Sequence, residues 1–241
     1  MPDPLVTRFR GGDRLALARL LSLASDGEQL DRVAETLALA DHRARVVAVT
    51  GGGGVGKSTL LGRLIELLRK RKLSVAVLAC DPQSSLTGGA LLGDRIRMPS
   101  RPDDTGVFIR SVATPAGLSG VAARLDVMAR LLAAFGFDIV LIETVGSGQG
   151  DTAVRDVADI VVVLVQPGTG DELQWEKAGQ LEIADVVVVH KADLPGAEIV
   201  ESQLREVLQV RERPVVLQVS ANKQLGIEQL WAAIEKVSWQ S

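Results

Sequence analysis

Residues 46–64 read VVAVTGGGGVGKSTLLGRL, an apolar run followed by a glycine-rich segment and then by a helical stretch. Residues 51–58 satisfy the pattern G-x-x-x-x-G-K-[ST] of a phosphate-binding loop, in the strand, loop and helix order that the motif requires. Glycines let backbone N–H groups turn inward around phosphates, and the helix that follows presents its positive end. A flexible glycine loop without a ligand does not account for this agreement of pattern and context. The stretch predicts a P-loop nucleotide-binding domain.

The loop also predicts individual contacts. Lys57 should neutralise the β- and γ-phosphate oxygens, and the Ser58 hydroxyl should ligate Mg²⁺. The residues expected to hold the phosphates are Gly51, Gly53, Gly54, Val55, Gly56, Lys57, Ser58 and Thr59. Related ATPases that partition chromosomes or place division septa have an extra lysine near the start of this loop, whereas residues 52–54 are all glycine here. This difference disfavours that class of ATPase.

Outside the loop, apolar segments alternate with helical stretches. Candidate strands cover residues 45–50, 74–80, 107–112, 138–143, 160–166, 186–190 and 214–220, and several are continuous Val/Ile/Leu runs, as in a parallel sheet covered on both faces. Candidate helices cover residues 58–72, 121–134, 172–181, 197–210 and 227–237. The alternation predicts an α/β fold over residues 45–241, a doubly wound, mostly parallel sheet that binds ligands at the carboxyl ends of its strands.

The first 44 residues predict a short N-terminal helical extension. Apolar stripes at helical spacing run from Leu17 to Ala24 and from Leu30 to Leu37, with Gly27 between them. We expect both stripes to pack on the main domain rather than to form a separate binding module.

Two carboxylates follow buried strands of the predicted sheet. Asp81 follows the strand at 74–80, and Glu143 ends the strand at 138–143, so both should emerge beside the phosphate site. Such oxygen ligands suit Mg²⁺, which keeps part of its hydration shell. We expect both residues near the metal ion. The competing interpretation of Asp81 is a turn residue before Pro82.

The residues that follow Glu143 predict a switch segment. Glu143 and Gly146 have the spacing of the D-x-x-G element, whose glycine N–H senses the γ-phosphate, with Glu in place of Asp. The segment GSGQGD at residues 146–151 is typical of a loop that orders and disorders with the phosphate. With Lys57 these residues form the candidate catalytic set. Gln149 is the candidate for orienting the attacking water, although a glutamine in a loop does not establish that role.

Residues 186–195 read VVVVHKADLP, a strand followed by a variant of Asn-Lys-x-Asp, the guanine-reading element of GTP-binding proteins. In this arrangement the Asp193 carboxylate accepts hydrogen bonds from guanine N1–H and NH₂, which adenine lacks, while the Lys191 stem stacks over the base. The later segment VVLQVSAN supplies Ser220, Ala221 and Asn222, which resemble the last nucleotide-binding element of GTPases. Order and spacing predict GTP and GDP as ligands, with Mg²⁺.

His190 stands where the guanine element has asparagine, the residue that ties the base to the P-loop. A neutral imidazole offers one N–H and one acceptor, so it can keep part of that connection. We expect guanine specificity with altered affinity. The competing interpretation is a strand-end histidine that touches no nucleotide.

Composition excludes several other classes. A net charge of −3 and an aromatic content of 3% disfavour a nucleic-acid-binding protein. No apolar run is long enough to span a bilayer, and the start MPDPLVTRFRGGDR lacks the apolar core of a signal peptide, so we expect a cytoplasmic protein without a membrane partner. One cysteine and two histidines provide neither a disulfide framework nor a Cys/His metal cluster. We expect Cys80 to be a core residue.

Further segments carry a family resemblance. They are DPQSSLTGGALLGDRIRM at 81–98, RSVATPAGLSG at 110–120, FDIVLIETVGSGQGD at 137–151, QPGTGDELQWEKAG at 166–179 and the helical start GGDRLALARLLSLASDG at 11–27. Over nearly its whole length the chain resembles the MeaB/ArgK-type G-protein chaperones of adenosylcobalamin-dependent acyl-CoA mutases. The resemblance implies a SIMIBI-class P-loop GTPase. It also implies that GTP hydrolysis gates delivery of adenosylcobalamin from an adenosyltransferase to the mutase, and removal of damaged cofactor.

The resemblance implies further site residues. Asp81, Asp94 and Glu143 match acidic residues around the nucleotide's Mg²⁺, and residues 146–150 match the second switch. Residues 167–177 match the third switch, which meets the mutase. The candidate partner contacts there are Asp171, Glu172, Gln174, Trp175 and Lys177. Spacing alone predicts only a loop and the start of a helix in that segment.

The chain departs from the family pattern at three places. One is His190, and another is Trp175 with Glu176, where relatives tend to have smaller or apolar residues. The third is that the chain ends soon after its last helix, without the C-terminal arm through which many relatives dimerise. A homodimer is still one of the expected oligomeric states. The expected clients are 2-hydroxyisobutyryl-CoA, isobutyryl-CoA or methylmalonyl-CoA mutase. The alternatives are a metal-insertion GTPase, which generally brings a Cys/His cluster, and a P-loop ATP-dependent kinase, which Asp193 disfavours.

Overall fold

The computed structural model describes residues 3–38, 42–82, 104–114, 121–146, 149–168, 178–208 and 214–237. In this part of the chain, seven strands form one sheet in the order β3-β2-β4-β1-β5-β6-β7, and each neighbouring pair is parallel. The strands are β1 (Arg45–Gly51), β2 (Val75–Pro82), β3 (Val107–Thr114), β4 (Ile139–Glu143), β5 (Ile160–Val165), β6 (Val186–His190) and β7 (Val215–Val219). The predicted α/β, doubly wound parallel sheet is confirmed.

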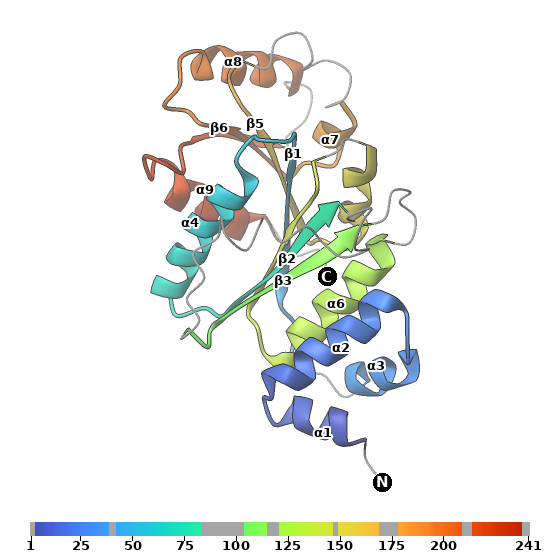
Figure 1. Cartoon of the computed structure of the whole chain (residues 1–241). Helices are drawn as coiled ribbons and strands as arrows, with labels where there is room; N and C mark the ends of the chain where they lie inside the picture. Colours follow the sequence, from blue (N-terminus) through green and yellow to red (C-terminus); the bar gives the residue numbers. More distant parts are fainter. Residues whose placement is uncertain are drawn as a thin grey trace.

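Helices cover both faces of the sheet (Figure 1). They are α1 (Pro4–Arg10), α2 (Arg14–Asp26), α3 (Leu30–Leu37), α4 (Lys57–Lys70), α6 (Val121–Phe135), α7 (Ala178–Glu182), α8 (Ala197–Leu208) and α9 (Ile227–Lys236), with a 3₁₀ helix η1 (Gln149–Asp156). In Figure 1, α4 and α9 lie on one side of the sheet, and α2, α3 and α6 lie on the other. Of the helix predicted at 172–181, residues 172–177 lie outside the described residues, as do residues 209 and 210 of the helix predicted at 197–210.

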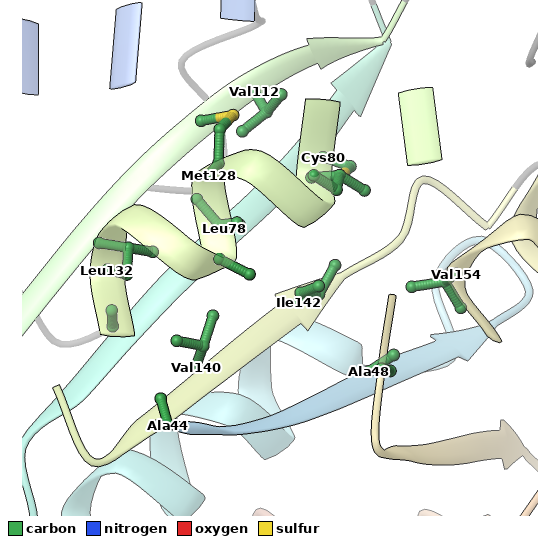
Figure 2. Close-up of a cluster of buried hydrophobic side chains, with 14 of the residues drawn as sticks. Ala44, Ala48, Leu78, Cys80, Val112, Met128, Leu132, Val140, Ile142 and Val154 are labelled. Carbon is green, nitrogen blue, oxygen red and sulfur yellow. The ribbon is translucent and has the colours of Figure 1, made fainter. Parts of the chain in front are cut away.

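Each strand divides its side chains between two cores. In β1, Val47 and Val49 join the core under α4 and α9, whereas Ala48 joins the core under α6. Figure 2 shows the second core, which includes Met128 of α6, Leu78 of β2 and Ile142 of β4. Both faces of the strands are therefore apolar, which explains the continuous Val/Ile/Leu runs in the sequence. Cys80 is buried in the same core, as expected.

The N-terminal helices share this core with the sheet. Leu17 and Leu20 of α2, and Val33 of α3, are buried in the cluster that contains α6, in agreement with the expected packing. The Arg14 guanidinium donates hydrogen bonds to the carbonyls of Thr105 and Val107, so α2 also holds the start of the edge strand β3. Among the described helices, none is long and apolar enough to cross a membrane.

Candidate nucleotide-binding site

The carboxyl ends of the strands bring the predicted site residues to one edge of the sheet. β1 ends at Gly51, where the P-loop begins, and the register pairs Val49 with Glu143 at the end of β4. Glu143 also pairs with Ala79 of β2, which places Asp81 two residues further along the same edge. The phosphate loop and both strand-end carboxylates therefore lie on the side of the sheet where ligands of doubly wound folds bind.

Two glycines of the P-loop are required by close contacts. A Cβ on Gly51 would lie 2.4 Å from the Leu164 carbonyl oxygen, and Gly51 has a φ of +141°. A Cβ on Gly56 would lie 2.5 Å from Cε1 of His190, and the φ of Gly56 is +104°. Gly56 also precedes the first residue of α4, so the chain turns there from the loop into the helix. Both positions need a residue without a side chain.

Lys57 is the first residue of α4, and its ammonium is turned into the loop. It donates hydrogen bonds of 2.8 Å to the Gly51 carbonyl and 3.2 Å to the Gly52 carbonyl. Gly146 lies against the same ammonium, because a Cβ added to it would be 2.5 Å from Lys57 Nζ and 2.6 Å from the Gly51 oxygen. The predicted phosphate lysine and the predicted γ-phosphate sensor are thus in direct contact.

Ser58 and Glu143, the predicted metal ligands on α4 and β4, meet directly. The Ser58 hydroxyl donates a 2.7 Å hydrogen bond to Glu143 Oε1. Glu143 and Asp81 are 4% and 6% exposed, so these carboxylates lie in an environment that favours a compensating cation. A hydroxyl and two carboxylates at a phosphate site are oxygen ligands of the kind that Mg²⁺ takes beside its own waters. The residues therefore fit this metal ion.

One polar contact here was not anticipated from the sequence. The Thr144 hydroxyl donates a 2.9 Å hydrogen bond to the Thr50 hydroxyl. The bond joins the ends of β4 and β1, so it fixes Glu143 relative to the P-loop. Two threonines 94 positions apart give no sequence signal for such a pair.

His190 ends β6 beneath the P-loop. Its Nδ1 lies 2.7 Å from the Val55 carbonyl oxygen, and the residue is 3% exposed. A carbonyl only accepts, so Nδ1 carries the hydrogen and Nε2 is the acceptor of the neutral ring. Burial lowers the pKa of His190 below its ordinary value, although the Val55 hydrogen bond acts in the opposite direction. The link to the P-loop expected at this position is present, while a contact with the base stays a prediction.

Lys191 adds a second link between β6 and the P-loop. Its Nζ donates a 2.9 Å hydrogen bond to the Gly54 carbonyl. The backbone of Lys191 has a φ of +57°, in the left-handed region, so the chain turns sharply just after the strand. After this turn the Ala192 N–H donates a 3.1 Å hydrogen bond to the Val219 carbonyl, which holds the segment before Asp193 against the end of β7.

Asp193, the predicted base reader, is held by Ser220 after β7. The buried Ser220 hydroxyl donates a hydrogen bond to Asp193 Oδ1 and accepts one of 3.2 Å from the Lys223 N–H. The hydrogen bond from Ser220 is the main cause that lowers the pKa of Asp193. Asp193 is exposed, and a carboxyl group whose pKa lies at or below its ordinary value is ionised at neutral pH, as an acceptor of guanine hydrogen bonds must be. Ala221 is buried next to it, and Asn222 is exposed.

Several predicted site residues lie wholly or partly outside the described part of the chain. Gln149 begins η1, but its side chain is outside what the structure describes. Outside the described residues altogether are Asp94, Asp171, Glu172, Gln174, Trp175 and Lys177. Their predicted roles remain predictions.

Residues 17–240 match the family described as methylmalonyl Co-A mutase-associated GTPase MeaB. The chain belongs to this family. The resemblance noted from the sequence is thereby confirmed, and the protein is a GTPase that binds GTP and GDP.

Relatives of this MeaB-family GTPase are named as GTPases or as a fused mutase. A putative GTPase of Pyrococcus abyssi is 42% identical and matches 98% of this chain and 76% of its own length. GTPase ArgK of Escherichia coli is 35% identical over 95% of this chain and 73% of its own length. A fused isobutyryl-CoA mutase of Nocardia farcinica is 41% identical over 87% of this chain, which corresponds to 20% of that protein.

Solved structures agree with the fold. A structure titled LAO/AO transport system kinase has a TM-score of 0.76 and 29% identity, covering 97% of this chain and 73% of that chain. The hydrogenase maturation factor HypB of Archaeoglobus fulgidus has a TM-score of 0.62 at 18% identity, covering 92% of this chain and 98% of its own, and shows the fold alone.

Proposed function

We propose that this GTPase is a chaperone of an adenosylcobalamin-dependent acyl-CoA mutase. GTP hydrolysis would gate delivery of adenosylcobalamin to the mutase and its protection there. The observation that carries the proposal is the fused isobutyryl-CoA mutase, in which a segment 41% identical to most of this chain belongs to a polypeptide named as a mutase. The family description, which names methylmalonyl Co-A mutase, supports the same class of partner.

Lys57 is the residue whose hydrogen bonds a bound nucleotide would change first. Its ammonium bonds to the Gly51 and Gly52 carbonyls. Phosphate oxygens compete for this ammonium because a hydrogen bond between two charged groups is stronger than one to a neutral carbonyl. Gly146 contacts the same ammonium, so a shift of the Lys57 side chain would change the packing of Gly146, which lies at the start of the predicted switch. GTP and GDP would then differ in how they hold Gly146.

Ser58, Asp81 and Glu143 would hold Mg²⁺, with Asp94 as a further predicted ligand. When bound, the ion neutralises charge that develops on the phosphate oxygens during hydrolysis. The Ser58 hydroxyl, now donated to Glu143 Oε1, would turn its oxygen lone pair to the metal ion. Glu143 would orient that hydroxyl and the waters of the ion. This assignment predicts that Glu143→Gln lowers Mg²⁺-dependent hydrolysis more than it lowers GDP binding.

The proposed partner is tested by measuring the rate of GTP hydrolysis with and without a mutase. The purified GTPase is mixed in turn with 2-hydroxyisobutyryl-CoA, isobutyryl-CoA and methylmalonyl-CoA mutase, and phosphate release is measured. We expect one of them to form a complex and to change the hydrolysis rate several-fold. The Lys57→Ala protein in the same mixtures measures any contaminating GTPase. No complex and no rate change with any of the three enzymes would contradict the proposed client class.

The cofactor-delivery step has its own test. An adenosyltransferase loaded with adenosylcobalamin is mixed with the cognate mutase and this GTPase, and transfer is followed by the absorbance of the cofactor. We expect transfer to depend on whether GTP or GDP is present. Equal transfer with GTP, with GDP and without the GTPase would show that the protein does not gate delivery.

Asp171, Glu172, Gln174, Trp175 and Lys177 are the proposed contacts with the mutase. Trp175 is the most informative, because aromatic anchors in polar surroundings are typical hot spots of interfaces. Trp175→Ala should weaken mutase binding by about 2 kcal/mol or more. Its effect on stimulation by the mutase should exceed any effect on basal hydrolysis. A variant that loses thermal stability together with basal hydrolysis would show that Trp175 packs within its own domain.

A further inference from the structure

Arg63 connects the phosphate half of the site to the base half. It lies on α4, six residues after Lys57, and its Nε donates a 3.1 Å hydrogen bond to the carbonyl oxygen of Ala221. Ala221 is 158 positions away in the sequence, in the Ser-Ala-Asn element. Arg63 also forms an ion pair with Glu66 one turn along the helix, at 3.0 Å. Nothing in the nucleotide motifs assigns a role to this arginine.

The segment that Arg63 holds is a tight loop. Ser220 and Leu225 exchange backbone hydrogen bonds of 3.0 Å in both directions, which closes the loop between them. The Gln224 N–H reaches the same Ala221 carbonyl at 3.4 Å, and Gln224 has a φ of +55°. The neighbouring Ser220 side chain bonds to Asp193. Arg63 therefore fixes the carbonyl adjacent to the residue that orients the predicted base reader.

We propose that Arg63 is a positioning residue for guanine-nucleotide binding. It sets the spacing between the phosphate loop and the loop at residues 220–225, which we call the base loop. Helix α4 carries Lys57 and Ser58 at its start and Arg63 about 9 Å further along its axis. A nucleotide has to satisfy both halves of the site at once, so a spacing fixed before binding reduces the ordering cost of binding.

Arg63 complements the two links made by β6. His190 bonds to Val55 and Lys191 bonds to Gly54, which ties β6 to the P-loop. Neither of these bonds holds the loop after β7. The hydrogen bond from Arg63 to Ala221 holds that loop from α4, the helix that follows the P-loop. The position of the base loop is therefore fixed relative to Lys57 and Ser58 on the same helix.

The positioning role of Arg63 rests on the proposal that Asp193 reads the base. The experiment below distinguishes a failure of the Arg63 role from a failure of the Asp193 assignment. Titrations measure the affinities for GDP, for IDP, which lacks the exocyclic amino group, and for inorganic pyrophosphate. The proteins compared are wild type, Arg63→Gln, Arg63→Lys, Asp193→Asn and Glu66→Gln. Glu66→Gln is the matched control, since it removes the ion pair and leaves the bond to Ala221 in place. Arg63→Lys keeps the charge without the Nε donor, so it separates charge from geometry.

We expect Arg63→Gln and Arg63→Lys to weaken GDP binding about tenfold, the equivalent of about 1.4 kcal/mol. The preference for GDP over IDP should fall, and pyrophosphate affinity should stay within about twofold of wild type, because the phosphate contacts are at the start of α4. Glu66→Gln should match wild type in all three titrations.

Three results would overturn the inference. If both Arg63 variants keep the GDP affinity and the GDP preference while Asp193→Asn loses the preference, Arg63 has no positioning role and the base site stands. If Asp193→Asn also keeps the preference, the base site itself is misassigned. If the Arg63 variants lose pyrophosphate and GDP affinity equally, the arginine supports the helix and not the base loop.

Discussion

His190 Nδ1 lies 2.7 Å from the carbonyl oxygen of Val55, so the residue that replaces the asparagine of the base element is hydrogen-bonded to the middle of the P-loop. The ring also leaves no room for a side chain at Gly56, where a Cβ would lie 2.7 Å from Nδ1. A histidine at this position therefore supports the loop by a hydrogen bond and by its volume. Burial nevertheless disfavours the protonated ring at this site, although the hydrogen bond to Val55 acts in the opposite direction.

The first prediction concerns pH. Burial holds the pKa of His190 below 6.5, so the unfolded chain binds more protons than the folded protein once the pH falls below 6.5. The free energy of unfolding should therefore decrease as the pH falls from about 6.5 towards the lower pKa of the folded state. His190→Gln should remove this dependence, measured by urea unfolding at a series of pH values.

The chain offers a matched control for the pH experiment. Its two histidines are His42 and His190, and His42 Nε2 lies 3.1 Å from the Phe137 carbonyl, away from the P-loop. His42→Gln should keep the pH dependence. The account of His190 is wrong if the dependence disappears in the His42 variant and persists in the His190 variant.

The second prediction is that Lys57→Ala loses GDP and GTP affinity by about 100-fold or more, about 2.7 kcal/mol. The reason is that the ammonium within the loop is the main protein cation for the β- and γ-phosphates. Lys70→Ala is the control, since it removes the same charge from an exposed position of the same helix. Both are measured by isothermal titration. Near-normal affinity of the Lys57 variant would remove the P-loop assignment.

The third prediction is that Asp193→Asn erodes the preference for GTP over XTP. The carboxylate only accepts hydrogen bonds, whereas an amide can also donate to the O2 of xanthine. The wild-type carboxylate is ionised at neutral pH, since the ordinary pKa of an aspartate is already low and the hydrogen bond from Ser220 lowers it further. Asp126→Asn on the surface of α6 controls for the loss of a negative charge. An unchanged preference in the Asp193 variant would show that another group reads the base.

The fourth prediction is that Gly146→Ala weakens nucleotide binding. Its φ is +82°, and the added Cβ would lie 2.5 Å from Lys57 Nζ, so the ammonium or the switch backbone has to move. Gly136→Ala provides the control, because Gly136 has a φ of +104° with nothing within 4 Å of the added Cβ. Both variants should lose thermal stability through backbone strain, and only Gly146→Ala should lose GDP affinity. Equal GDP affinity in the two proteins would contradict the Lys57–Gly146 contact.

Local sequence patterns predicted most of the fold because their physical causes are local. The Val/Ile runs reflect strands buried on both faces, and the P-loop glycines at 51 and 56 reflect close backbone contacts. Helix α1 lies within the predicted N-terminal helical extension, but no apolar stripe marks it, since seven residues are too few for a periodic pattern. Its N-terminal signal is nevertheless present, as Asp3 accepts a 2.8 Å hydrogen bond from Leu5 N–H and Pro4 occupies the first helical position.

The contacts that assemble the site are long-range, and no local pattern specifies them. Arg63 meets Ala221, and Thr144 meets Thr50, only because the order of the strands brings their segments together. Motif spacing placed Asp193 and Ser220 in separate elements of one site. The hydrogen bond between them, which lowers the pKa of Asp193 and orients its carboxylate, is visible only in the structure.

A site with His190 in place of asparagine should still bind guanine in preference to adenine, and one calorimetric experiment measures this preference. The wild-type protein is titrated with GDP and, separately, with ADP under identical conditions with Mg²⁺ present. We expect saturable binding of GDP with a stoichiometry of one nucleotide per chain and no detectable heat of binding for ADP. Binding of ADP as tight as that of GDP would show that Asp193 does not select the base and that this site does not read guanine.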